Sequence, residues 1–120
     1  MILADTSVWV DHLRHGNREL VRHLDAGEVA CHPFVIGELA CGQLSSRATV
    51  LGLLNQLPSV PTVSHDEAMA FVEARRLDGR GLGWVDVHLL ASAVLGGVRL
   101  WTLDRRLAEA ALAKRTHPPA

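Results

Sequence analysis

Four carboxylic acids interrupt stretches of the 120-residue chain that are otherwise apolar. Asp5 is the only charged residue among the first ten, and Glu38 interrupts the stretch PFVIGELAC. Asp86 interrupts GLGWVDVHLLASAV, and Asp104 ends the run VRLWTL. Apolar neighbours predict burial, and burying an ionised carboxylate without a partner costs several kcal/mol. The four acids therefore indicate a compensating charge that they share.

A divalent metal ion is the simplest source of that charge. Two carboxylates about 4 Å apart repel by about 4 kcal/mol at an effective dielectric constant of about 20, so four together need cations or protons between them. Ligation by oxygen alone suits Mg²⁺ or Mn²⁺ better than zinc or copper. Such ions generate hydroxide from water, orient a phosphodiester and stabilise the leaving oxygen. The acids therefore predict phosphodiester hydrolysis that depends on a metal.

Each acid, taken alone, also has a purely structural interpretation. Asp5 and Asp104 precede predicted helices and are good N-caps. Asp86 falls in the first turn of a helix, where it complements the helix dipole. Glu38 can pair with a distant arginine. These interpretations stay open for single residues, and the coincidence of all four favours a shared site.

The elements that must position these acids alternate between strand and helix. Apolar runs predict strands at 1–4, 28–32, 60–63 and 98–103. Helical spacing, the capping box from Ser64 to Glu67, Pro33 and the Gly96–Gly97 pair predict helices at 6–15, 17–26, 33–42, 46–57, 64–77, 84–95 and 105–114. This alternation predicts an α/β fold with a parallel sheet. Ligands collect beyond the carboxyl ends of such strands, where Asp5 and Asp104 lie.

Length and composition indicate one globular domain over 1–120, with a tail from about residue 115. Hydrophobic residues make up 48% and charged residues 21%, and no apolar stretch is long enough to cross a membrane. The N-terminus lacks the features of a secretory signal, so we expect a cytoplasmic protein. We expect Cys31 and Cys41 to be buried free thiols, since they lack the paired spacing of a zinc site.

Charge gives a mixed indication about nucleic acid. The net charge of −1 offers no overall positive field. Eleven of the twelve basic residues are arginine, however, and the planar guanidinium is suited to bidentate phosphate contacts.

Four segments resemble the four motifs of PIN-domain proteins. They are MILADTSVWVDHLR, PFVIGELACG, GLGWVDVHLLASAV and LWTLDRRL, and their order fits over nearly the full chain. The match looks most like the VapC toxins of bacterial toxin-antitoxin pairs. The resemblance implies a three-layer α/β/α sandwich and Mg²⁺- or Mn²⁺-dependent endoribonuclease activity. It implies acidic ligands at Asp5, Glu38, Asp86 and Asp104.

The resemblance also implies partners and supporting residues. It implies a homodimer, an RNA substrate and a cognate VapB-like antitoxin whose tail lies across the acidic groove. Thr6, Ser7 and Thr102 look like groups that orient carboxylates or water. Candidates for phosphate contacts are Arg14, Arg75, Arg76, Arg80, Arg105 and Arg106. The apolar segments around Trp9, Trp84 and Trp101 place these three rings in the core.

Other functions fit less well. A catalytic histidine needs a nearby nucleophile or acid partner, and the spacing of the seven histidines indicates none. A phosphorylation-receiver domain is the main alternative, because it also alternates strand and helix and holds Mg²⁺ with acids at strand ends. Receivers need adjacent acids after the first strand and a lysine near the last, whereas Asp5 stands alone and the only lysine is Lys114.

Overall fold

A three-stranded parallel sheet forms the centre of the molecule. The computed structural model describes the backbone of residues 1–116 and the side chains of residues 1–112. Strands β1 (Ile2–Ala4), β2 (Val29–Ala30) and β3 (Arg99–Trp101) are arranged in the order β2-β1-β3. In β1, Leu3 is opposite Ala30 of β2 and Leu100 of β3. The parallel sheet predicted from the sequence is thus confirmed.

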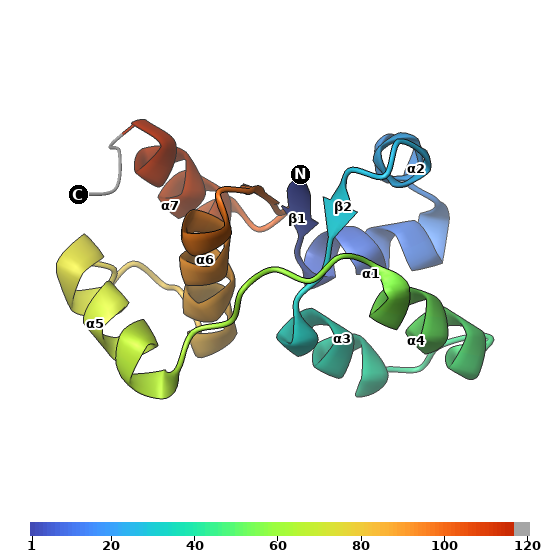
Figure 1. The fold of residues 1–120 in the computed structure, drawn as a ribbon, viewed down its shortest axis with the longest axis horizontal. Helices are drawn as coiled ribbons and strands as arrows, with labels where there is room; N and C mark the ends of the chain where they lie inside the picture. Colours follow the sequence, from blue (N-terminus) through green and yellow to red (C-terminus); the bar gives the residue numbers. More distant parts are fainter. Residues whose placement is uncertain (117–120) are drawn as a thin grey trace.

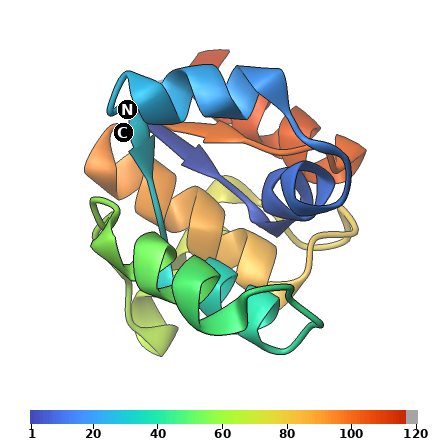
Figure 2. The same cartoon turned by 90° about the vertical axis from the view of Figure 1, so that its right-hand side faces the viewer.

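Seven helices surround this sheet in residues 1–116. They are α1 (Thr6–His15), α2 (Arg18–Asp25), α3 (Pro33–Ala40), α4 (Arg47–Gln56), α5 (His65–Arg75), α6 (Trp84–Gly96) and α7 (Arg105–Thr116). Helices α1 to α4 lie towards one end of the long axis and α5 to α7 towards the other (Figure 1). Figure 2 shows the strands crossing the middle of the molecule, with α2 above them and α6 below. Helices therefore cover both faces of the sheet, as expected for an α/β/α sandwich.

Capping residues explain where several helices begin and end. The Asn17 side chain accepts the Leu20 N–H at 2.9 Å, and Ser64 and Glu67 form the predicted capping box. Pro33 occupies the first position of α3, where its missing N–H costs nothing. Gly97 ends α6 with φ +65°, a conformation that favours glycine.

Two groups of apolar side chains form the core. The larger packs around β1 and includes Leu3, Leu20 and Leu89, each at most 1% exposed. The smaller lies between α5, α6 and α7 and includes Ala68 and Ala110. Within residues 1–116, no helix has the length and hydropathy needed to span a membrane.

The predicted strand at 60–63 is wrong. The chain beside β2 forms only an isolated bridge, between Cys31 and Ser59, and Val60 donates one N–H to the Cys31 carbonyl at 3.1 Å. Pro58 and Pro61 flank this contact and have no N–H to extend a ladder. The last helix runs on to Thr116, and so covers the start of the expected tail; residues 117–120 lie outside the described part.

Two predictions of burial are also wrong. Cys31 is buried as expected, but Cys41 is exposed because it lies just past α3, whose inward face carries Val35 and Leu39. Trp9 belongs to the core, whereas Trp84 is 40% exposed because it opens α6 at the surface. Trp101 is half-buried.

Candidate metal centre

Asp5 is fixed at the carboxyl edge of the sheet by two hydroxyl groups. Its N–H donates to the Trp101 carbonyl at 3.0 Å, which continues the β1–β3 register and places Thr102 beside it. Thr102 donates its hydroxyl to Oδ2 at 2.5 Å, and Ser7 donates to Oδ1 at 2.5 Å. Oδ1 also accepts the Val8 N–H at 3.3 Å and so caps α1. The carboxylate is 5% exposed and has one defined orientation.

The same two hydroxyls hold the segment that carries Asp104. The Thr102 hydroxyl oxygen accepts the Asp104 N–H at 3.0 Å, and the Ser7 oxygen accepts the Leu103 N–H at 2.9 Å. Oδ1 of Asp104 accepts the Leu107 N–H at 3.0 Å and caps α7. Ser7 and Thr102 therefore tie the ends of β1 and β3 together, which brings Asp104 to the side of the sheet where Asp5 lies.

Asp86 interacts electrostatically with both of these acids. It is the third residue of α6, and its Oδ2 accepts the Gly83 N–H at 2.9 Å. Burial raises its pKa above the usual range, the Gly83 N–H partly offsets this, and the negative charges of Asp104 and Asp5 raise the pKa further. Asp86 is therefore close enough to Asp104 and to Asp5 to be affected by the charge of each.

Glu38 reaches the site through Thr6. It is exposed on α3, and its Oε1 accepts the Thr6 hydroxyl at 2.6 Å. Thr6 follows Asp5 directly, so this bond joins α3 to the first turn of α1. We expected apolar neighbours to bury all four acids. Asp5 is buried as expected, and Asp86 is only half-buried. Glu38 and Asp104 are exposed because they lie on the outer side of a helix and in a cap.

The donor chemistry of this edge fits a hard divalent cation. All four candidate ligands are carboxylates, and the side chains that touch them are hydroxyls. Within the described residues, no three acids, histidines or cysteines lie close enough together to ligate one ion as placed. Asp5, Asp86 and Asp104 are instead each hydrogen-bonded to a nearby backbone N–H. The structural interpretation of these three acids therefore applies, since each contacts the start of a helix, and their role as metal ligands stays a prediction.

The predicted phosphate-contact arginines are separated into different places. Arg80, Arg105 and Arg106 line one pocket together with Asp104. Arg14 lines another with Glu38. Arg75 lies over the Phe71 ring, 5.4 Å from its centroid, and Arg76 ends α5 in a left-handed conformation.

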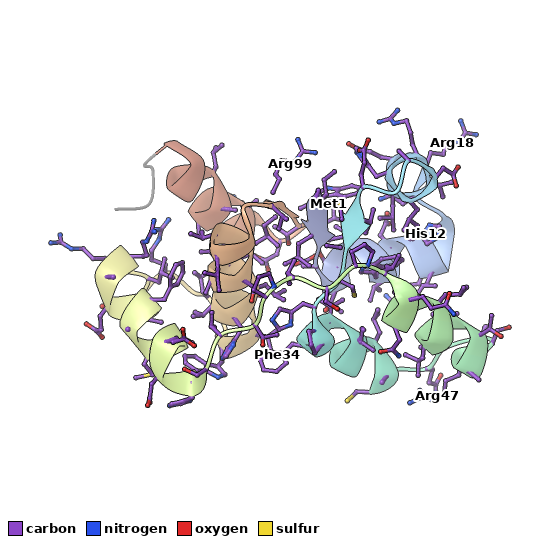
Figure 3. The ribbon with its side chains drawn as sticks, in the orientation of Figure 1. Met1, His12, Arg18, Phe34, Arg47 and Arg99 are labelled. Carbon is purple, nitrogen blue, oxygen red and sulfur yellow. The ribbon has the colours of Figure 1, made fainter. Side chains whose placement is uncertain are left out.

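Sequence reasoning missed a row of aromatic rings beside the acids, which we call the aromatic face: Phe34, His65, Trp84 and His88. The Phe34 and Trp84 rings each lie 4.8 Å from the His88 ring, and His65 lies 5.2 Å from Trp84. Phe34 is at the surface at the start of α3 (Figure 3), and both Phe34 and Trp84 are 40% exposed. The signal in the sequence was the four-residue spacing between Trp84 and His88, which makes the two rings neighbours on one face of a helix.

Comparisons with known proteins identify the family and the fold of the chain. Two relatives named Ribonuclease VapC32, from the CDC 1551 / Oshkosh and the ATCC 25618 / H37Rv strains of Mycobacterium tuberculosis, are each 55% identical over 108 residues, covering 89% of this chain and 87% of theirs. The crystal structure of PAE2754 from Pyrobaculum aerophilum has a similar fold, with a TM-score of 0.58 at 22% identity, over 91% of this chain and 83% of that one.

The family description "PIN domain" matches residues 2–112. This match spans all four acids and the carboxyl ends of β1 and β3. It decides against a receiver domain. The resemblance predicted from the four motifs is confirmed, and the chain belongs to the PIN-domain family.

Proposed function

We propose that this chain is a metal-dependent endoribonuclease whose catalytic and metal-binding residues are Asp5, Glu38, Asp86 and Asp104. The observation that carries the proposal is the arrangement at the carboxyl edge of the sheet, where Ser7 and Thr102 join Asp5 to the segment of Asp104 and the charges of both acids act on Asp86. A protein gains no stability by gathering like charges, so the arrangement favours a cation-binding role. The 55% identity to proteins named ribonucleases supports RNA as the substrate.

Mg²⁺ or Mn²⁺ is the cofactor that the four carboxylates fit best. When bound, such an ion supplies a nucleophilic hydroxide and stabilises the leaving oxygen of an in-line displacement at phosphorus. Nucleases of this family are metal-dependent as a class, and the choice of ion is our proposal from the all-oxygen donor set.

The chain's own residues orient these ligands. Ser7 and Thr102 each donate their hydroxyl hydrogen to Asp5, so both oxygens of that carboxylate accept a hydrogen bond from a fixed direction. Thr6 holds Glu38 near the same edge. Because Glu38 and Asp104 are exposed, they line the side from which RNA approaches.

An antitoxin is the partner that the resemblance to VapC toxins implies. We propose that the chain is the toxin of a toxin-antitoxin pair, with a VapB-like antitoxin as its partner. An open groove of about 320 Å³ beside Glu38 supports this, because it combines apolar side chains such as Val10, Leu13 and Leu39 with Arg14. A groove of this composition suits an extended segment with apolar and charged side chains.

A homodimer that uses the aromatic face completes the proposal. The exposed rings of Phe34 and Trp84 adjoin the imidazole of His88, and burial lowers the pKa of this histidine, which favours its neutral form. Exposed aromatic residues of this kind are typical of interface cores. Phe34 is one helical turn from Glu38, and Trp84 is two residues from Asp86, so a second copy here brings two acidic sites near each other. We also propose a cytoplasmic protein with a single domain over 1–120.

Cleavage of RNA with and without metal tests the central assignment. The wild-type chain should cut a labelled single-stranded RNA internally when Mg²⁺ or Mn²⁺ is added, and a chelator should stop it. Asp5→Asn should abolish cleavage and keep the circular dichroism spectrum, while Asp25→Asn at the exposed end of α2 should cut as wild type does. Equal cleavage by Asp5→Asn and wild type would refute the assignment.

A further inference from the structure

An open pocket of about 600 Å³ lies beside Asp104 and is lined by three arginines. Arg105 and Arg106 come from the first turn of α7, and Arg80 comes from the loop before α6; Asp104 and Glu109 complete the lining. We call these three side chains the arginine pocket. Segments 24 or more residues apart thus bring three guanidinium groups to one wall of the acidic site.

Two of the three arginines have no partner for their charge among the side chains that the structure describes. Arg105 Nε lies 3.3 Å from Glu109 Oε1 and forms an ion pair with it. Among residues 1–112, neither Arg80 nor Arg106 makes an ion pair or a side-chain hydrogen bond. Oδ1 of Asp104 is taken by the Leu107 N–H. The arginine pocket therefore has guanidinium donors available for an external anion.

Gly81 lies against the Arg106 side chain. A Cβ at Gly81 would lie 2.7 Å from Arg106 Cδ and 3.0 Å from Nε and Nη1, so the loop backbone touches the guanidinium arm because this residue has no side chain. Gly81 also has φ +77°, a conformation that favours glycine. Two residues later, Gly83 donates its N–H to Asp86. The loop thus contacts both the arginine pocket and an acid of the metal centre.

We propose that the arginine pocket binds a backbone phosphate of the RNA strand next to the phosphate that is cut. This inference rests on the proposed ribonuclease function and names how the strand is held. Guanidinium groups donate in pairs to phosphate oxygens and cannot accept, and no aromatic ring lines the pocket to stack on a base. Because the chain has a net charge of −1 and an acidic centre, a local cationic wall is needed to hold a polyanion there.

Substitution of single arginines tests the contact. Binding of a short, fluorescently labelled single-stranded RNA is measured in chelating buffer, so that it is not cut, for Arg80→Gln, Arg106→Gln and the control Arg18→Gln. Arg18 is exposed on α2, towards the other end of the molecule (Figure 3). The two pocket variants should bind about tenfold more weakly. The slope of log affinity against log salt should fall by about 0.7 for each, and Arg18→Gln should change neither.

A second pair of variants, one test and one control, examines the position of Arg106 without changing any charge. Gly81→Ala and Gly79→Ala both place alanine at positive φ, +77° and +70°, but only Gly81→Ala meets Arg106, since nothing lies within 4 Å of the position at Gly79. Both should lose similar stability. Gly81→Ala alone should weaken RNA binding, and with Mg²⁺ it should raise the KM for cleavage with a smaller effect on kcat.

The outcomes separate this inference from the proposed function. If Arg80→Gln and Arg106→Gln bind RNA with wild-type affinity and salt slope while the wild type cuts RNA, the arginine pocket is not a phosphate site and the nuclease assignment stands. If Arg18→Gln weakens binding as much as Arg80→Gln and Arg106→Gln do, RNA responds only to the overall charge of the protein and the proposal is wrong. If no metal supports cleavage, the proposed function fails, and the binding series still decides the pocket on its own.

Discussion

Thr102 donates its hydroxyl hydrogen to Oδ2 of Asp5 at 2.5 Å, although the two residues are 97 positions apart in the chain. The parallel pairing of β1 with β3 creates this contact, because it places the residues that follow Ala4 and Trp101 side by side. One hydroxyl thus serves the acid after β1 and, through the N–H of Asp104, the acid after β3.

Removal of this hydroxyl should impair metal use while leaving the fold intact. Thr102→Val keeps the shape of the side chain but leaves one oxygen of Asp5 without its donor, so cleavage should fall about 10- to 100-fold at limiting Mg²⁺. The effect is measured as the cleavage rate at a series of Mg²⁺ concentrations. Thr102→Ser keeps the hydroxyl and should retain most of the wild-type rate. The control Thr62→Val, in an exposed loop, should behave as wild type. An unchanged metal dependence in Thr102→Val would show that the hydroxyl has no orienting role.

Asp86→Asn should stabilise the protein when no metal is present. Burial and the charges of Asp104 and Asp5 raise the folded-state pKa of Asp86, so the ionised form destabilises the fold at pH values above that pKa. The amide keeps an oxygen for the Gly83 N–H and removes the charge. Urea unfolding in chelator should show this gain as a higher unfolding free energy of the variant at pH 7.

That gain should disappear at acid pH, below the unfolded-state pKa, where the wild-type carboxyl is neutral in both states. The exposed Asp78→Asn serves as the control and should show no such pH-dependent gain. A loss of stability in Asp86→Asn at pH 7 would contradict the repulsion that we infer.

His32 should make the fold sensitive to mild acid. Its imidazole is 1% exposed, Nδ1 accepts the Phe34 N–H at 2.9 Å, and burial, with a smaller effect of His88, lowers its pKa to about 4. The unfolded chain takes up this proton near pH 6.5, so stability falls as pH drops from there to about 4. Between pH 7.5 and 5 the loss from this residue should be roughly 1–2 kcal/mol.

His32→Asn keeps an acceptor at the N-cap of α3 and removes the titration, so its unfolding free energy should depend less on pH over that interval. The exposed His15→Asn should retain the wild-type dependence. If His32→Asn and wild type lose equal stability between pH 7.5 and 5, then His32 does not stay neutral in the folded protein.

Substitution in the aromatic face should dissociate the proposed dimer. Phe34→Arg puts a charge among the rings of α3 and α6, whereas Leu53→Arg changes an exposed apolar residue of α4 that is 59% exposed. Sedimentation equilibrium over a range of concentrations should show a dimer for wild type and Leu53→Arg, and a monomer for Phe34→Arg. A wild-type monomer throughout that range would exclude the dimer, and dissociation by Leu53→Arg would place the interface elsewhere.

The helices were largely predictable from the sequence because their ends carry local signals. Pro33, the Ser64–Glu67 capping box and Gly97 act within a few residues, and the structure uses them as expected. The run at 60–63 has strand-like apolar residues, but its pairing depends on the neighbouring backbone and on Pro58 and Pro61. Strand pairing is a long-range property, so an apolar run predicts it less well.

The candidate site was predictable as a set of acids but not as an arrangement. Asp5, Asp86 and Asp104 stand out because they interrupt apolar stretches, and each proves to cap a helix or contact its start as well. The contact of Thr102 with Asp5 depends on strand register, which no local pattern specifies. The convergence of Arg80 and Arg106 depends likewise on the packing of α6 against α7.

Direct measurement of Mn²⁺ binding tests the central claim that the carboxylates form one metal centre. Free Mn²⁺ is followed by electron paramagnetic resonance as protein is added, with Mg²⁺ as competitor. Wild type and Asp25→Asn should bind equally, whereas Asp5→Asn, Glu38→Gln, Asp86→Asn and Asp104→Asn should each bind at least about tenfold more weakly. Wild-type affinity in Asp5→Asn and Asp104→Asn, or no Mn²⁺ binding by the wild type, would contradict the account.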